Sequence, residues 1–192
     1  GINAEYGEMT LKLNFNRSSS EQLSRYIFDL AKKYPVENIT TNQDQSVTFN
    51  TYFFGPQNDD SPFYQQLFQV TITLTTDFPY KNPSIGVKPR TIYHPNICFK
   101  SGSVCVNALK ADWKPEYSLV DVLEIILPSM LVQMNVEDPQ DLQVAESYKT
   151  DFEKSLKKAK DMLKFMGFKR EKVGEIKCTE YFKGKLQQNG WM

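Results

Sequence analysis

The pattern of apolar positions predicts one helix followed by a strand-rich region. Residues 18–34 are a predicted helix, with a Ser-x-x-Glu capping box at its start and an apolar stripe made of Leu23, Ile27, Leu30 and Ala31. Three later segments are rich in β-branched and aromatic residues and are predicted strands: 47–55, 67–75 and 84–89. Turn-forming residues separate them, so we expect an antiparallel meander.

The second half of the chain is predicted to be a long loop followed by helices. Residues 91–117 show little periodicity, and irregular segments of this length are uncommon and usually functional. Helical spacing returns at Ser118, which has a capping partner three residues later. A further helix is predicted to start at Asp138-Pro139, and another follows Thr150. The order of helix, strands, loop and helices indicates an α+β fold.

Length suggests one domain with extensions at both ends. A chain of 192 residues, 40% of them hydrophobic, suits a core domain of roughly 150 residues. We assign residues 1–16 to an N-terminal extension, 17–166 to the core and 167–192 to a lysine-rich C-terminal extension.

Charge and cysteine content exclude several classes of protein. Lys+Arg and Asp+Glu both number 23, so nothing in the whole-chain charge indicates a nucleic-acid or anionic membrane partner. No apolar run is long enough to span a bilayer, and the start has no signal-peptide pattern. Three cysteines without metal-ligand spacing fit a reduced compartment, with no metal site and no disulfide framework. The predicted compartment is the cytoplasm, with the nucleus as a second one.

Candidate chemistry concentrates in the long loop, which holds the only histidine, His94, and a cysteine, Cys105. A cysteine and a histidine can form a hydrolase dyad with histidine as the base, although the local signatures of such enzymes are missing. The alternative is that Cys105 is a buried core thiol. Composition alone favours the buried core thiol.

Four motifs in this order resemble the ubiquitin-conjugating family over about Arg17 to Met166: HPNI at 94–97, SGSVCVNAL at 101–109, DWKP at 112–115 and EDP at 137–139. The interval from Asn96 to Cys105 is one residue longer than the family's commonest spacing. With this insertion and the segment Pro83-Ser84-Ile85-Gly86, the chain looks closest to the branch associated with ubiquitin transfer to histones and other acceptors.

The resemblance implies a fold and an activity. The expected UBC fold has an N-terminal helix, a four-stranded antiparallel meander, a long active-site loop and C-terminal helices. Cys105 would accept ubiquitin from an activating enzyme as a thioester and pass it to a substrate lysine, usually with a ligase. No cofactor is expected, because ATP and Mg²⁺ are used by the activating enzyme. The sulfur of Cys105 is expected to be reachable at the mouth of the loop.

The resemblance also assigns roles to two polar residues near Cys105. Asn96 would donate a hydrogen bond to the oxyanion of the transfer step, or it would hold the loop in place. Asp138 would orient and desolvate the incoming lysine, cap a helix at Pro139, or do both.

Four other loop residues are expected to support the site. His94 is interpreted as structural, with its ring bonded to loop backbone, and a base is the alternative. Tyr93 and Pro95 are expected to pack the loop, and Asn107 to shape the gate beside Cys105.

The predicted ligase surface comprises the first helix with Tyr80, Pro115, Glu116 and Arg25. It departs from the family pattern at three places: the usual basic start of the first helix is reduced to Arg25, Glu116 replaces a small residue, and Gln65-Gln66 replaces paired glycines. They leave the choice of ligase and activating enzyme open. Two alternatives remain for the whole protein: conjugation of another ubiquitin-like modifier, or a non-catalytic scaffold of the same fold.

Overall fold

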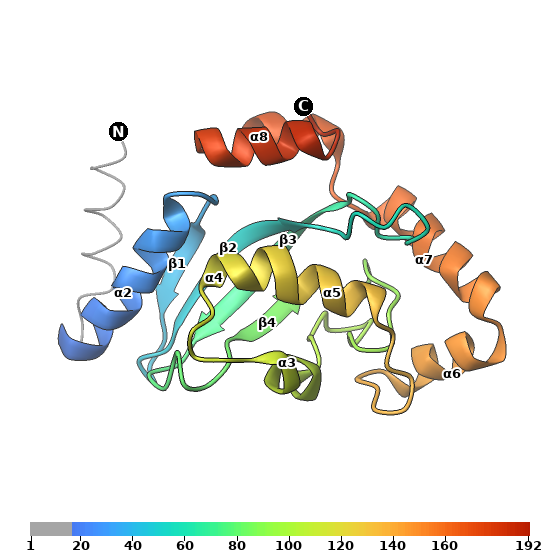
Figure 1. Ribbon diagram of the computed structural model, residues 1–192, viewed down its shortest axis with the longest axis horizontal. Helices are drawn as coiled ribbons and strands as arrows, with labels where there is room; N and C mark the ends of the chain where they lie inside the picture. Colours follow the sequence, from blue (N-terminus) through green and yellow to red (C-terminus); the bar gives the residue numbers. More distant parts are fainter. Residues whose placement is uncertain (1–16) are drawn as a thin grey trace.

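The computed structural model describes residues 17–192, so the predicted N-terminal extension lies outside the described residues. Helix α2 and four strands occupy the first half of the described chain: α2 (Arg17–Ala31), β1 (Glu37–Thr41), β2 (Val47–Phe54), β3 (Leu67–Leu74) and β4 (Ser84–Val87). The second half is mostly helical (Figure 1).

The four strands form one antiparallel sheet in the order β1-β2-β3-β4, so the predicted α+β meander is confirmed. Phe49 lies opposite Ile72, and Phe53 lies opposite Phe68. These side chains are buried on one face of the sheet. This register places Phe49, Phe53 and their partners on one face of the sheet, while Tyr52 and Phe54 lie on the opposite face.

One helical run crosses the core face of this sheet (Figure 1). It consists of α4 (Leu119–Asp121), a π-helical turn over Val122–Ile126 and α5 (Leu127–Val132). Its start is the predicted one, since Asp121 N–H donates to Ser118 Oγ at 3.1 Å and the Asp121 carboxylate accepts from Ser118 N–H at 2.9 Å. The π turn ends two residues before Pro128, which has no N–H to continue the α-helical ladder.

The helices near the active-site loop differ from the prediction in two places. Residues Val106–Asp112 form a short helix, α3, inside the segment predicted to be irregular. Helix α6 (Leu142–Thr150) begins after Asp141, whose Oδ1 accepts from Val144 N–H at 3.2 Å, so the predicted helix start at Asp138 is wrong. The physical reason is that the N–H groups of Gln140 and Asp141 both donate to the carbonyl of Pro95, at 2.9 and 3.1 Å.

The end of the chain is folded against the domain. Helix α7 (Phe152–Met166) follows α6, and then come a 3₁₀ turn (Arg170–Glu175) and helix α8 (Glu180–Gln188). Figure 1 shows α8, in red, beside the end of β2. Phe182 of α8 is fully buried, with its ring 5.5 Å from that of Tyr34 and 5.6 Å from that of Phe54. Residues 168–192 therefore extend the core. Among residues 17–192 no helix is both long and apolar enough to cross a membrane.

Candidate active site

A tight hairpin over residues 97–104 positions the loop that carries Cys105. Ile97 and Val104 form an antiparallel bridge, and Gly102 N–H donates to the carbonyl of Cys98 at 2.7 Å. Gly102 has φ +79°, and a Cβ there would lie 1.9 Å from the carbonyl oxygen of Val87. Only glycine fits this close approach, which lets the hairpin bond to the end of β4.

Cys105 follows the hairpin directly and occupies the N-cap position of α3. Its N–H donates to the carbonyl of Asn96 at 2.9 Å, which joins the cysteine to the HPN motif. The residue is only 4% exposed, although Val106 and Asn107 after it are exposed. The sulfur is therefore largely covered, and the expectation of a freely reachable thiol is not met in this conformation.

The side chain of Asn96 is buried and engaged with the loop before α6. Its Oδ1 accepts from Asn135 N–H at 2.9 Å, and its Nδ2 donates to the Asn135 carbonyl at 3.0 Å. A longer bond of 3.4 Å runs from Nδ2 to the carbonyl of Asp138. Of the two roles considered for Asn96, the geometry is that of a residue holding the loop.

Asp138 is exposed and sits at the end of a turn organised by Asn135. The Oδ1 of Asn135 accepts from the N–H groups of Glu137 and Asp138, both at 3.1 Å. The carboxylate of Asp138 accepts a long hydrogen bond of 3.5 Å from Asn107 Nδ2. Asn107 is two residues after Cys105, so this contact places an acidic group and an amide beside the covered thiol.

His94 is fully buried beneath the loop. Its Nδ1 accepts from Asn96 N–H at 3.0 Å, and its ring centroid lies 5.9 Å from that of Phe63. Burial lowers the pKa of His94 to about 4, so the ring is neutral at physiological pH. Nε2 is buried without a hydrogen-bond partner, and no hydrogen bond joins His94 to Cys105 within residues 17–192. The ring organises loop backbone.

Tyr93 and Pro95 fix the loop through their carbonyl groups. The hydroxyl of Tyr148 donates to the Tyr93 carbonyl, and Pro95 accepts from the two residues preceding α6. Tyr148, Asn135 and Asp141 were all missed by sequence reasoning. Asp141 alone carried a local signal, because aspartate preceding an apolar helical segment is a common N-cap.

The sequence model described as "Ubiquitin-conjugating enzyme" matches residues 23–163. The chain belongs to the ubiquitin-conjugating enzyme family. The matched segment contains the whole Cys105 site and ends before residues 168–192.

Relatives of the chain carry the name of the same family. Over 91 residues the chain is 41% identical to ubiquitin-conjugating enzyme E2-23 kDa of Triticum aestivum, covering 47% of this chain and 48% of that protein. Over 102 residues it is 34% identical to ubiquitin-conjugating enzyme E2-24 kDa of Saccharomyces cerevisiae, covering 53% and 45%. The chain thus spans about half the length of the curated relatives it matches.

A solved structure shows the same fold. The E2 domain of a ubiquitin conjugating enzyme from Toxoplasma gondii superposes with a TM-score of 0.62 at 23% identity, covering 77% of this chain and 99% of that chain. That likeness concerns the fold. It confirms the UBC architecture predicted from the motifs.

The residues predicted to form the family's ligase surface are all exposed: Tyr80, Pro115, Glu116 and Arg25. Aromatic contacts link the three elements that carry them. Trp113 Nε1 donates to the Pro79 carbonyl at 2.7 Å, and the Trp113 ring lies 5.7 Å from that of Phe78. Phe78 in turn packs edge-on against Tyr26 of α2 at 4.8 Å. The structure therefore brings these exposed residues onto neighbouring segments.

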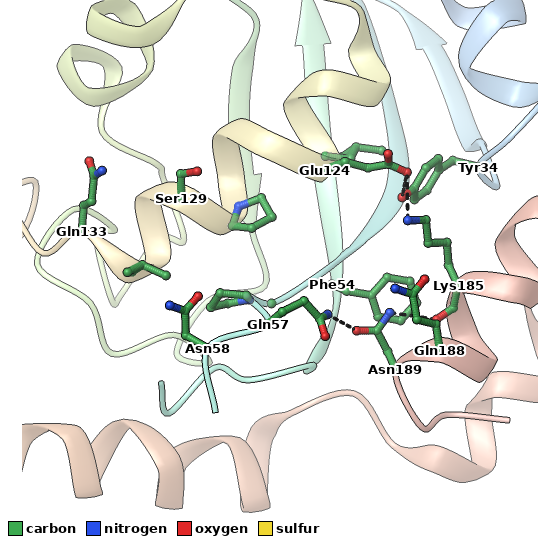
Figure 2. Close-up of a pocket in the computed structure, with 15 residues that line it drawn as sticks. Tyr34, Phe54, Gln57, Asn58, Glu124, Ser129, Gln133, Lys185, Gln188 and Asn189 are labelled. Atoms are coloured by element: carbon green, nitrogen blue, oxygen red, sulfur yellow. Dashed lines mark hydrogen bonds and ion pairs between the residues drawn. The ribbon is translucent and has the colours of Figure 1, made fainter. Parts of the chain in front are cut away.

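A cavity of about 380 Å³ lies elsewhere, between the loop after β2, the helix over the sheet and α8 (Figure 2). Glu124 at its edge accepts from the hydroxyls of Tyr34 and Tyr181 and pairs with Lys185 at 3.8 Å. Neither Cys105 nor its polar neighbours line this cavity, so it is separate from the candidate active site. No cluster of potential metal ligands was found among residues 17–192.

Proposed function

We propose that this protein is a ubiquitin-conjugating enzyme that carries ubiquitin as a thioester on Cys105 and transfers it to a substrate lysine. The observation that carries the proposal is the position of Cys105. It lies at the start of α3, hydrogen-bonded to Asn96 of the HPN motif, inside the segment that matches the family. The named relatives favour ubiquitin over other modifiers.

The first step is thioester exchange. Ubiquitin arrives as a thioester on a cysteine of the activating enzyme. The thiolate of Cys105 attacks the thioester carbonyl carbon, and the cysteine of the activating enzyme leaves as a thiolate. The acyl group is conserved as a thioester, so no ATP is needed here. Since Cys105 is covered, the long contact between Asn107 and Asp138 is proposed to open and expose the sulfur.

The second step is attack by the neutral amine of lysine. A tetrahedral oxyanion forms and then collapses, with Cys105 leaving as a thiolate and the lysine proton passing to solvent. Asp138 is proposed to orient the amine, because its carboxylate is exposed beside the loop of Cys105. The second N–H of Asn96, which makes only the 3.4 Å bond, is the group available to stabilise the oxyanion.

Partners and setting complete the proposal. The chain is proposed to receive ubiquitin from an activating enzyme and to bind a ligase through Tyr80, Pro115, Glu116 and Arg25, which are all exposed. It is proposed to act in the cytoplasm, with the nucleus as a second compartment. Assignment to the histone-type branch rests on the loop between Asn96 and Cys105 and on the segment 83–86, and it is part of the same proposal.

A charging assay tests the function directly. Incubation with activating enzyme, ATP and ubiquitin should give an adduct that a reducing agent removes. Cys105→Ser should convert it to a reductant-stable ester, while Cys98→Ser should still charge. Absence of any adduct would contradict the enzyme proposal and favour a scaffold. Charging only by a different ubiquitin-like protein would reassign the modifier, and an adduct lost in Cys98→Ser alone would move the site.

A further inference from the structure

Asp141 joins two parts of the active site that are far apart in sequence. Its Oδ2 accepts from the N–H of Phe99 at 2.9 Å, within the hairpin that precedes Cys105. Its Oδ1 accepts from the N–H of Val144 at 3.2 Å, in the first turn of α6. Each carboxylate oxygen therefore has its own backbone donor, and one side chain ties the hairpin to the start of a helix.

The segment that carries Asp138 is thereby held at both of its ends. At one end, Asn135 forms a pair of hydrogen bonds with the side chain of Asn96, at 2.9 and 3.0 Å. At the other end, Asp141 is bonded to the hairpin through its side chain and to Pro95 through its N–H, at 2.9 and 3.1 Å. Asp138 lies between these two attachments, and it is exposed.

We propose that Asp141 is a positioning residue for the transfer step. By fixing the segment between α5 and α6 against the hairpin, it sets the place of the Asp138 carboxylate relative to Cys105. This inference rests on the proposed function. A reacting group displaced by about 1 Å can lose as much as ~100-fold in rate, so a tie of this kind affects transfer more than it affects thioester formation.

The first experiment separates transfer from loading. Protein charged on Cys105 is mixed with free lysine at a series of concentrations, and aminolysis and spontaneous hydrolysis of the thioester are measured separately. For Asp141→Ala we expect aminolysis to fall about tenfold, while hydrolysis and loading change less than about twofold. Asp141→Asn keeps one acceptor oxygen and should fall in between.

Asp151→Ala is the matched control. Asp151 caps α7 in the same way, accepting from Lys154 N–H at 3.1 Å, but has no bond to the hairpin. Both alanine variants lose a helix cap, but only Asp141→Ala also loses the hydrogen bond to the hairpin. Equal aminolysis rates in the two variants would overturn the proposal, because capping alone would then account for the effect.

Two further measurements show whether Asp141 acts through Asp138. In an Asp138→Asn background, Asp141→Ala should change aminolysis less than about twofold, whereas independent effects would multiply. Amide hydrogen exchange at Phe99 should be faster in Asp141→Ala, and unchanged exchange would show that the tie does not exist in solution. Hydrogen exchange can be measured on protein that is not charged. The hydrogen bond of Asp141 is therefore tested independently of the proposed function, which would be rejected if the wild-type protein failed to charge.

Discussion

Cys98 and Cys178 differ in their readiness to form a thiolate. A hydrogen bond from Ser101 holds the pKa of Cys98 below its usual value, while burial raises the pKa of Cys178. Alkylating reagents react with the thiolate. We therefore expect iodoacetamide at pH 7.5 to modify Cys98 several-fold faster than Cys178, as followed by peptide mass spectrometry. Ser101→Ala should slow the reaction of Cys98, and equal rates at the two sites would contradict this account.

His94 should make stability depend on pH. Its pKa is about 4 in the folded chain because of burial, against an ordinary value of 6.5. As the pH falls, His94 therefore becomes protonated at a higher pH in the unfolded chain than in the folded chain. The contribution of the neutral ring is complete above about pH 6.5 and is lost as the pH falls toward 4, amounting to about 3 kcal/mol.

The measurement for His94 is the free energy of unfolding in urea from pH 7.5 to 4. His94→Asn keeps an acceptor in reach of Asn96 N–H but does not titrate. The variant will be less stable overall, since it leaves space in the core. The informative quantity is the slope, which should be shallower than in the wild type between pH 6.5 and 4. Parallel curves for the two proteins would rule out this role of His94.

The elements that were predicted well have strong local signals. Helix α7 has apolar residues at helical spacing, a capping aspartate at Asp151 and Gly167 after its last residue. Strands β2 and β3 are rich in β-branched and aromatic residues, and over most of β3 buried and more exposed positions alternate. In each case propensity, pattern and packing agree, so local reasoning was enough.

The missed elements have weak or misleading local signals. Strand β1 is short and polar, and the left-handed backbone at Asn38 (φ 54°) accompanies a break in its pairing with β2. Helix α3 has only seven residues and is preceded by Cys105, whose side chain makes no capping bond. For α6, Pro139 suggested too early a start, because bonding of the next residues to Pro95 depends on tertiary structure.

The same limit applies to the candidate site. Motifs spread along the chain predicted which residue types form the site, but they did not predict which of these residues contact each other. Asn96 and Asn135 are 39 positions apart, and Tyr93 and Tyr148 are 55 apart. Neither pair follows from periodicity or spacing. Cys105 is only 4% exposed, and no local sequence pattern predicts how far a loop cysteine is covered in the folded chain.

We expect Asn96 to hold the segment between α5 and α6 in place. Asn96→Ala removes an acceptor and a donor from Asn135, so hydrogen exchange at Asn135 N–H should be faster. Transfer to free lysine should fall about 10²-fold, the typical cost of losing such a donor, while loading of Cys105 persists. Asn96→Asp keeps the acceptor only and should restore slow exchange but not transfer. If Asn96→Asp restored transfer as well, the donor would have no part in the chemistry.

At the scale of the whole molecule, residues after the family domain are built into the core. Trp191 Nε1 donates to the carbonyl of Gln65 at 2.8 Å, and Gln65 Nε2 donates to Gln57 Oε1 at 3.0 Å. Gln57 donates to Asn189 at 2.6 Å (Figure 2). This connects the loop between β2 and β3 to the end of α8. The departure at Gln65-Gln66 from the family's paired glycines therefore coincides with a contact made by the C-terminal segment.

Phe182 is the residue through which α8 contributes most to this core. It is fully buried and contacts the rings of Tyr34, Tyr52 and Phe54, all of which are themselves buried. Phe182→Ala should lower the free energy of unfolding by about 3–5 kcal/mol, as measured by urea denaturation. The control is Phe165→Ala on α7, which is 75% exposed and should change it by less than about 0.5 kcal/mol.

Charging of Cys105 distinguishes a stability effect from a catalytic one. Phe182 lies on α8 beside β2, and the aromatic rings that it contacts, those of Tyr34, Tyr52 and Phe54, are not part of the Cys105 site. Below its unfolding transition, Phe182→Ala should therefore load ubiquitin at close to the wild-type rate. A loss of stability no larger than that of Phe165→Ala would mean that α8 is not part of the folded core. Slow loading by a fully folded Phe182→Ala variant would instead show that α8 is coupled to the active site, which its contacts do not predict.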